Sequence, residues 1–243
     1  MYAFKQGINF LKLKSMKITK INSLAIICFL LLTAGSITVN SQTMRDMNGT
    51  VYRTIKYGIQ EWTATNLNTT KFRNGDVIPE AKTKEEWSKA GNEEKPAWCY
   101  YKNDPVNGLK YGKLYNWYAI NDKRGLAPDG WHISINKDWE LLIKNLLGID
   151  YAGIKLKSTN GWKSKNGVDK IGFSALPGGI RDEEGNFGYM GTISQWWSNT
   201  EPVEVKKSNL IYSVKLNDNT VEVSYIKTKK ATGLAVRCVK AVK

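Results

Sequence analysis

Alternating hydrophobic and polar positions predict strands near both ends of the chain. Residues 51–57 alternate and are followed, after a glycine turn, by a second alternating run at 60–65, which predicts a hairpin. Residues 210–227 contain two alternating runs around an Asn-Asp-Asn turn, which predicts another hairpin. Residues 234–239 are apolar on both faces, as is typical of a central strand.

A helical spacing of apolar residues marks the segment from Ile135 to Gly148. Either Ser134 or Asn136 can cap its start, and Asp138 in the first turn suits the helix dipole. We expect one buried stripe rather than a cofactor site, formed by residues at positions i, i+3, i+4, i+7 and i+8: Trp139, Leu142, Ile143, Leu146 and Leu147.

A second, shorter helix is predicted by the capping-box spacing of Thr83 and Glu86. It carries Trp87 and can end at Gly91. Long irregular stretches are expected around 91–130 and 150–207.

Together these patterns predict an α+β fold with two helices, antiparallel strands and long irregular loops. No linker or repeat interrupts the chain after residue 42, so we expect residues 42–243 to form a single domain. Irregular segments of this length are typical of a functional surface or of a fold that depends on loops.

The first 41 residues have the pattern of a secretory signal peptide. Residues 1–41 contain five lysines and no acidic residue, and the apolar run 24–34 is too short to span a membrane. The expected cut precedes Gln42, and Met16 is a possible true start. Cys28 lies inside the apolar run, where a lipid-anchored cysteine is the alternative. The prediction is an exported protein, in the periplasm, at the cell surface or outside the cell, without a transmembrane segment after cleavage.

The net positive charge indicates which classes of partner the surface could bind. The chain of 243 residues has a net charge of +14, and 31 basic against 22 acidic residues remain after residue 41. Such a surface suits acidic glycans, anionic lipid or nucleic acid, although a lysine-rich solvated surface is the simpler interpretation. No segment combines clustered arginines with interleaved aromatics, and export separates the protein from nucleic acid, so nucleic acid is not expected as a partner.

Cysteine and histidine counts exclude several chemistries. One histidine, His132, and three cysteines rule out zinc sites built from several such ligands and CxxC redox pairs. After export, Cys99 and Cys238 remain as an even pair in an oxidising compartment, which predicts a disulfide. Two buried thiols acting as small hydrophobes are the alternative.

Several ordered motifs resemble one protein family. The phrase Gly125–Trp139 is similar to the "APxGWxLPTxxEW" phrase that leads into the second helix of C-type-lectin-like domains, including those similar to formylglycine-generating enzymes. Two matching segments precede this phrase, Val51–Leu67 and Asn74–Pro79, and four follow it in order: Gly172–Arg181, Gly185–Phe187, Trp196–Glu201 and Ala235–Val239. Together they resemble the Fibrobacter succinogenes major paralogous domain from about residue 47 to 240, found in exported proteins of Bacteroidota and Fibrobacterota.

This resemblance implies a C-type-lectin-like fold and an extracytoplasmic location, but it does not imply an activity. Ser134 and Ile135 stand where the family phrase usually has Pro and Thr, which moves the helix cap by one residue.

A calcium-dependent lectin is not favoured. Such lectins present Glu-Pro-Asn or Gln-Pro-Asp followed by Trp-Asn-Asp, whereas here Val203 follows Glu201-Pro202 and has no side-chain oxygen. The acidic run with Asp182, Glu184 and Asn186 is a weak metal candidate, and a solvated hairpin turn explains it as well. No metal and no other cofactor is predicted.

An enzyme is the alternative to a binding domain. Formylglycine-generating enzymes use a cysteine pair near the end of the domain, where this chain has only Cys238. His132 is expected to be a hydrogen-bonded structural residue, and no pair of carboxylates is singled out for glycan processing.

The remaining hypothesis is a non-catalytic recognition domain for a glycan or a cell-surface protein. Trp162, Trp196 and Trp197 could stack on sugar rings or anchor a partner, although one of the adjacent pair should face the core. Arg181 could pair with an acidic ligand or pack its stem on a tryptophan. The oligomeric state is not predicted.

Overall fold

The computed structural model describes residues 43–202 and 208–241, of which all belong to one compact unit. The signal peptide predicted for 1–41, including Met16 and Cys28, lies outside these residues, and so does Val203. None of the described helices has the length and apolar composition needed to span a bilayer.

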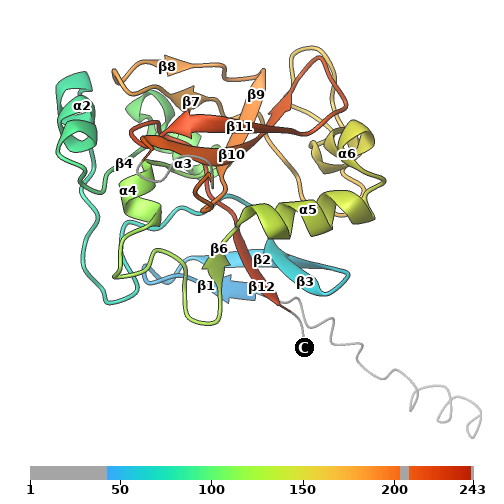
Figure 1. Cartoon of the computed structure of the whole chain (residues 1–243), viewed down its shortest axis with the longest axis horizontal. Coiled ribbons are helices and arrows are strands. Elements are labelled where there is room, and N and C mark those ends of the chain that lie inside the picture. Colours follow the sequence, from blue (N-terminus) through green and yellow to red (C-terminus); the bar gives the residue numbers. More distant parts are fainter. Residues whose placement is uncertain (1–42, 203–207, 242–243) are drawn as a thin grey trace, which may run out of the picture. The chain divides into compact units, whose positions relative to one another are not determined.

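Helices and short antiparallel sheets are mixed along the chain, which confirms the α+β class (Figure 1). The strands are β1 Thr43–Arg45, β2 Val51–Tyr57, β3 Gln60–Thr63, β4 Trp98–Cys99, β5 Leu114–Tyr115, β6 His132–Ile133, β7 Ile180–Arg181, β8 Phe187–Gly188, β9 Ile193–Trp197, β10 Leu210–Asn217, β11 Ser224–Lys229 and β12 Cys238–Ala241. The helices are α2 Lys84–Asn92, the 3₁₀ turn η1 Tyr101–Asn103, α3 Pro105–Tyr111, α4 Trp117–Ile120, α5 Asn136–Asn145 and α6 Ile149–Leu156.

The largest sheet joins both ends of the described chain, in the order β1-β2-β3-β12-β6. The predicted opening hairpin is confirmed as β2–β3, with Ile55 opposite Trp62. The last strand, β12, lies between β3 and β6, so the prediction of a central strand is confirmed, although the strand begins at Cys238 rather than at residue 234.

The second predicted hairpin is confirmed as β10–β11 in a sheet of order β11-β10-β9. Its second strand starts at Ser224, later than the alternation suggests. The backbone of Val221 accepts a hydrogen bond from Ile154, and the Val223 N–H donates to Ile149. Contacts with α6 therefore occupy backbone groups that the prediction assigned to the hairpin.

Helix α2 begins as its local sequence predicts. The Thr83 hydroxyl accepts from the Glu86 N–H at 3.1 Å, and the Glu86 carboxylate accepts from the Thr83 N–H at 2.9 Å. This capping box pairs two N–H groups that the helix start would otherwise leave unbonded.

Helix α5 is also confirmed, but its cap differs from the prediction. The N-cap position is Ile135, which has no side-chain acceptor, and the Thr200 hydroxyl accepts from the Asn136 N–H at 2.9 Å. Ser134 instead accepts from the Trp139 indole N–H at 3.0 Å. A residue 64 positions away in the chain thus completes the helix start.

The prediction of two helices was too low, because α3, α4 and α6 lie in stretches expected to be irregular. Asp104 and Asn116 cap α3 and α4 with their side chains. These helices have four to eight residues, too few for a repeating apolar stripe. Of the stripe predicted in α5, four members are buried, whereas Leu147 is exposed after the helix ends.

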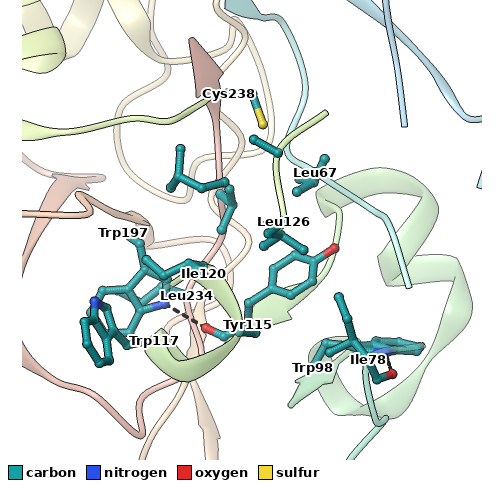
Figure 2. Packing of buried hydrophobic residues seen from close by; sticks show 14 of the residues in the cluster. Leu67, Ile78, Trp98, Tyr115, Trp117, Ile120, Leu126, Trp197, Leu234 and Cys238 are labelled. Carbon is teal, nitrogen blue, oxygen red and sulfur yellow. Dashed lines mark hydrogen bonds between the residues drawn. The ribbon is translucent and has the colours of Figure 1, made fainter. Parts of the chain in front are cut away.

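The interior is rich in tryptophan. Eight of the nine tryptophans are buried, and their indole N–H groups often donate to backbone carbonyls. In Figure 2, the Trp197 indole donates to Tyr115 O at 2.7 Å and the Trp98 indole donates to Ile78 O at 2.9 Å. The high tryptophan content is therefore mainly a property of the core.

The predicted disulfide between Cys99 and Cys238 is wrong in this structure, where both cysteines are free and buried. Cys99 packs in a cluster with Trp87 and Leu114, whereas the sulfur of Cys238 points into the cluster of Figure 2. Burial raises the pKa of each thiol to about 12. The alternative, two thiols acting as small hydrophobes, describes them.

Candidate functional site

The three tryptophans predicted to meet a ligand are all in the interior, which corrects that expectation. Trp196 and Trp197 are 0% exposed and Trp162 is 5% exposed. The adjacent pair points to opposite faces of β9, as strand geometry requires, but a hydrophobic cluster covers each face. Neither ring is therefore available to a sugar at the surface.

Arg181, the other predicted ligand residue, is also buried, and it joins two segments of the chain. Its guanidinium donates to Ala81 O at 2.7 Å and to Thr83 O at 2.8 Å, just before α2. It also donates to Gly185 O at 3.1 Å in the turn between β7 and β8. The guanidinium carbon lies 4.8 Å from the Trp87 ring centre, so the packing interpretation of Arg181 describes the structure.

The acidic run after Arg181 forms the turn between β7 and β8. Asp182 accepts from the Asn186 backbone N–H at 2.7 Å and from its side-chain amide at 3.0 Å. Glu183 pairs with Lys229. Within 43–202 and 208–241, no group of three or more His, Cys, Asp or Glu side chains is placed to hold a metal ion. The solvated-turn interpretation accounts for this segment.

A hollow of about 430 Å³ opens between this turn, the N-terminal end of α2 and the η1 turn. We call it the basic hollow. Its lining consists of Lys82, Lys84, Lys102, Asn103, Arg181, Gly185, Asn186 and Phe187. All of its ionisable side chains are cationic, and its volume lies in the range of small-ligand sites.

The positive charge of the basic hollow is only partly neutralised by the protein. Lys82 lies 3.6 Å from Glu80, whereas Lys84 and Lys102 have no ion pair in the described part of the chain. The N-terminal end of α2 adds the positive pole of a helix dipole. Hydrogen bonds from the Thr83 and Lys82 backbone N–H groups lower the pKa of Glu86, the residue that completes the cap.

Lys102 reaches the basic hollow through an unusual backbone. Lys102 and Asn103 both have left-handed conformations, with φ of 53° and 55°. Such residues cost about 1–3 kcal/mol each and persist where the surroundings hold them. The Asn103 side-chain amide donates to Lys82 O at 2.7 Å, which ties the turn to the segment before α2.

Sequence reasoning identified Arg181 and Asn186 but missed the three lysines. Lys82 and Lys84 flank the capping residue Thr83, which is a local signal that could have been noticed. Lys102 comes from a distant turn, and nothing in the sequence places it beside α2.

His132 is exposed and lies away from the basic hollow's lining. Its Nε2 is 2.8 Å from a carboxylate oxygen of Asp138, which also accepts from the Ile135 N–H at 3.0 Å. The histidine is hydrogen-bonded at the start of α5, as expected.

The structure thus defines an α+β domain with a cationic surface hollow. Comparison with protein-family models matches residues 55–240 to the Fibrobacter succinogenes major domain. The match covers most of the chain, and the protein belongs to this family. Comparisons with curated proteins and with solved structures gave no match.

Proposed function

We propose that this protein is an exported, non-catalytic recognition domain that binds an acidic glycan in the basic hollow. The observation that carries the proposal is the lining, which has Lys84 and Lys102 without an ion pair and no acidic side chain. A carboxylated sugar would pair its charge with these ammonium groups, while a hydroxyl group would donate to the side-chain oxygen of the exposed Asn186.

The choice of a glycan over nucleic acid rests on the aromatic ring in the lining. Single-stranded nucleic acid is bound by free aromatic faces on which bases stack. The Phe187 ring lies 4.7 Å from the Arg181 guanidinium and 5.3 Å from the Tyr101 ring centre. Phe187 is half-buried, and it is the one aromatic residue in the lining. A single ring whose surface is partly occupied by these contacts favours charge pairing and hydrogen bonding over the stacking of successive bases.

Export and the finer fold assignment belong to the same proposal. The basic, then apolar start of the chain supports export to the periplasm or the cell surface. A C-type-lectin-like fold is supported by the Gly125–Trp139 phrase, which leads into α5, the second of the two longest helices described.

The test uses calorimetric titration of the purified protein with a galacturonic acid oligomer and, separately, with a neutral maltose oligomer of equal length. We expect the acidic oligomer to bind more tightly. The double variant Lys84→Glu, Lys102→Glu should bind it about tenfold more weakly, a change worth about 1.4 kcal/mol. Glu suits the first turn of α2, so the substitution at position 84 should not impair folding.

The matched control is Lys56→Glu, Lys137→Glu, which changes the net charge equally at two exposed lysines outside the hollow. It should keep the parent affinity within about twofold. Equal loss in both double variants, or no difference between the acidic and neutral oligomers, contradicts the proposal.

A further inference from the structure

A second depression lies at the opposite, C-terminal end of α2. Two adjoining hollows of about 340 and 280 Å³ share Gly91, Asn92, Tyr118 and Asn209 in their linings. We call them together the Tyr118 hollow. The shared residues come from α2, α4 and the position just before β10, and Glu184 reaches the larger hollow from the β7–β8 turn. Figure 1 shows α2 beside the ends of these strands.

The floor of the Tyr118 hollow depends on a close approach. A Cβ atom added to Gly91 would lie 2.7 Å from Ala231 Cβ, so the helix touches the segment after β11 without room for a side chain. The Tyr118 ring packs edge-on against Trp117, with ring centres 5.8 Å apart. Tyr118 is half-buried, so one aromatic surface is held in place at the edge of the hollow.

The lysines of the Tyr118 hollow already have partners. Lys229 forms an ion pair with Glu183, and the Lys230 ammonium lies 4.2 Å from the Trp117 ring centre. Glu94 and Glu184 retain carboxylates without an ion pair among the described residues. An anionic ligand would be repelled by these carboxylates, in contrast to the basic hollow.

Several hydrogen-bonding groups of the Tyr118 hollow have no intramolecular bond in the described part. They are the side-chain amides of Asn92 and Asn209, the Tyr118 hydroxyl and the Glu184 carboxylate. An aromatic surface surrounded by free amides and a carboxylate matches a sugar ring, which has an apolar face and a rim of hydroxyl groups.

We propose that the Tyr118 hollow binds an uncharged sugar ring. The C–H face of the ring packs on Tyr118, and its hydroxyl groups bond to Asn92, Asn209 and Glu184. This site shares no lining residue with the basic hollow, so each of the two proposals can be tested independently of the other.

Side-chain amide resonances of Asn92 and Asn209 provide a direct readout. We would record ¹H–¹⁵N spectra of the purified protein with D-glucose, D-galactose, D-mannose or N-acetyl-D-glucosamine, each at about 50 mM, because single sugar rings bind in the millimolar range. At least one sugar should shift both amide signals saturably. Sodium D-glucuronate at the same concentration should shift them less.

Tyr118→Ala should weaken this binding about tenfold, whereas Tyr118→Phe, which keeps the ring, should weaken it less. Tyr151→Ala removes an exposed tyrosine elsewhere, on α6, and should have no effect. The absence of saturable shifts with all four sugars overturns the inference, and so do unchanged shifts in Tyr118→Ala with an intact backbone spectrum. Loss of galacturonic acid binding alone would overturn only the proposed function.

Discussion

The two ends of α2, a helix of nine residues, carry hollows of opposite chemistry. At the N-terminal end, lysines before and after Thr83 meet Lys102 and leave an excess of positive charge. At the C-terminal end, the lysines are paired or stacked, and amides, a tyrosine and carboxylates remain. The helix dipole adds to this difference, because it is positive at the N-terminal end of α2 and negative at the C-terminal end.

This difference shows that surface composition alone is a poor guide to a binding site. The chain is lysine-rich throughout, but a lysine contributes to an anion site only where no carboxylate or ring has taken it up. The turn between β7 and β8 lies next to both hollows, with Glu183 and Glu184 on one side and Asn186 on the other. Substitutions in α2 or in this turn can therefore change binding in one hollow without changing it in the other.

The largest effect is expected from Arg181→Ala, because this side chain joins the start of α2 to the turn. Its loss leaves the carbonyls of Ala81 and Gly185 without a donor among the described residues, and the Thr83 carbonyl keeps only the Trp87 N–H. We expect destabilisation of roughly 3–5 kcal/mol in urea unfolding. Arg53→Ala, at an exposed arginine, should cost less than about 1 kcal/mol. Comparable values for the two variants would show that Arg181 is not a structural link.

Gly91→Ala should affect only the C-terminal end. Alanine normally favours a helix over glycine by about 1 kcal/mol, but the contact of 2.7 Å with Ala231 must be relieved. We therefore expect net destabilisation of about 1–2 kcal/mol and weaker sugar shifts at Asn92.

Gly188→Ala is the matched control, because an added Cβ there meets nothing within 4 Å. A stabilised Gly91→Ala protein in thermal unfolding would mean that the helix can move away from Ala231. Retained binding of the galacturonic acid oligomer in Gly91→Ala would confirm that the ends are independent.

Salt concentration should affect binding in the two hollows differently, and we expect this effect to be smaller than those of the substitutions. Raising the salt concentration from about 50 to 300 mM shortens the range of charge interactions, so galacturonic acid binding should weaken several-fold. Shifts caused by neutral sugars should stay unchanged in the same buffers. Equal salt sensitivity at both ends would contradict the distinction between them.

The smallest effect concerns the two buried thiols, Cys99 in the cluster with Trp87 and Cys238 in the cluster of Figure 2. Burial raises each folded-state pKa to about 12, above the ordinary value of 9.0. The unfolded chain therefore loses these protons first, so stability is full below pH 9 and falls as the pH rises toward 12. The loss is about 0.4 kcal/mol per thiol at pH 9.

Unfolding curves at several pH values would measure this loss. The free energy of unfolding of Cys99→Ala or Cys238→Ala should fall less steeply with pH than that of the parent protein. Without reductant, iodoacetamide should modify both cysteines after unfolding and neither before, as read by mass spectrometry of the peptides. Cysteine peptides that stay joined until a reductant is added would show that the Cys99–Cys238 disulfide does form.

Local signals predicted the elements that their own residues can form. Thr83 and Glu86 satisfy each other's backbone N–H groups, so the start of α2 was predictable from four residues. The start of α5 was not, because its hydrogen bond to Thr200 crosses to a distant segment. The candidate site shows the same division, since Arg181 and Asn186 were identified but Lys102 was not.

The sequence by itself determined the hairpins, the two main helices and the membership of the family, because alternation, helical spacing and ordered motifs depend on neighbouring residues. Only the tertiary structure decided that β9 is covered on both faces, which buries Trp196 as well as Trp197, and that Cys99 and Cys238 lie in separate clusters. It also decided which lysines are taken up by partners and which remain free at the end of α2. Burial and charge pairing depend on segments far apart in the chain, and no local pattern records which of them will meet.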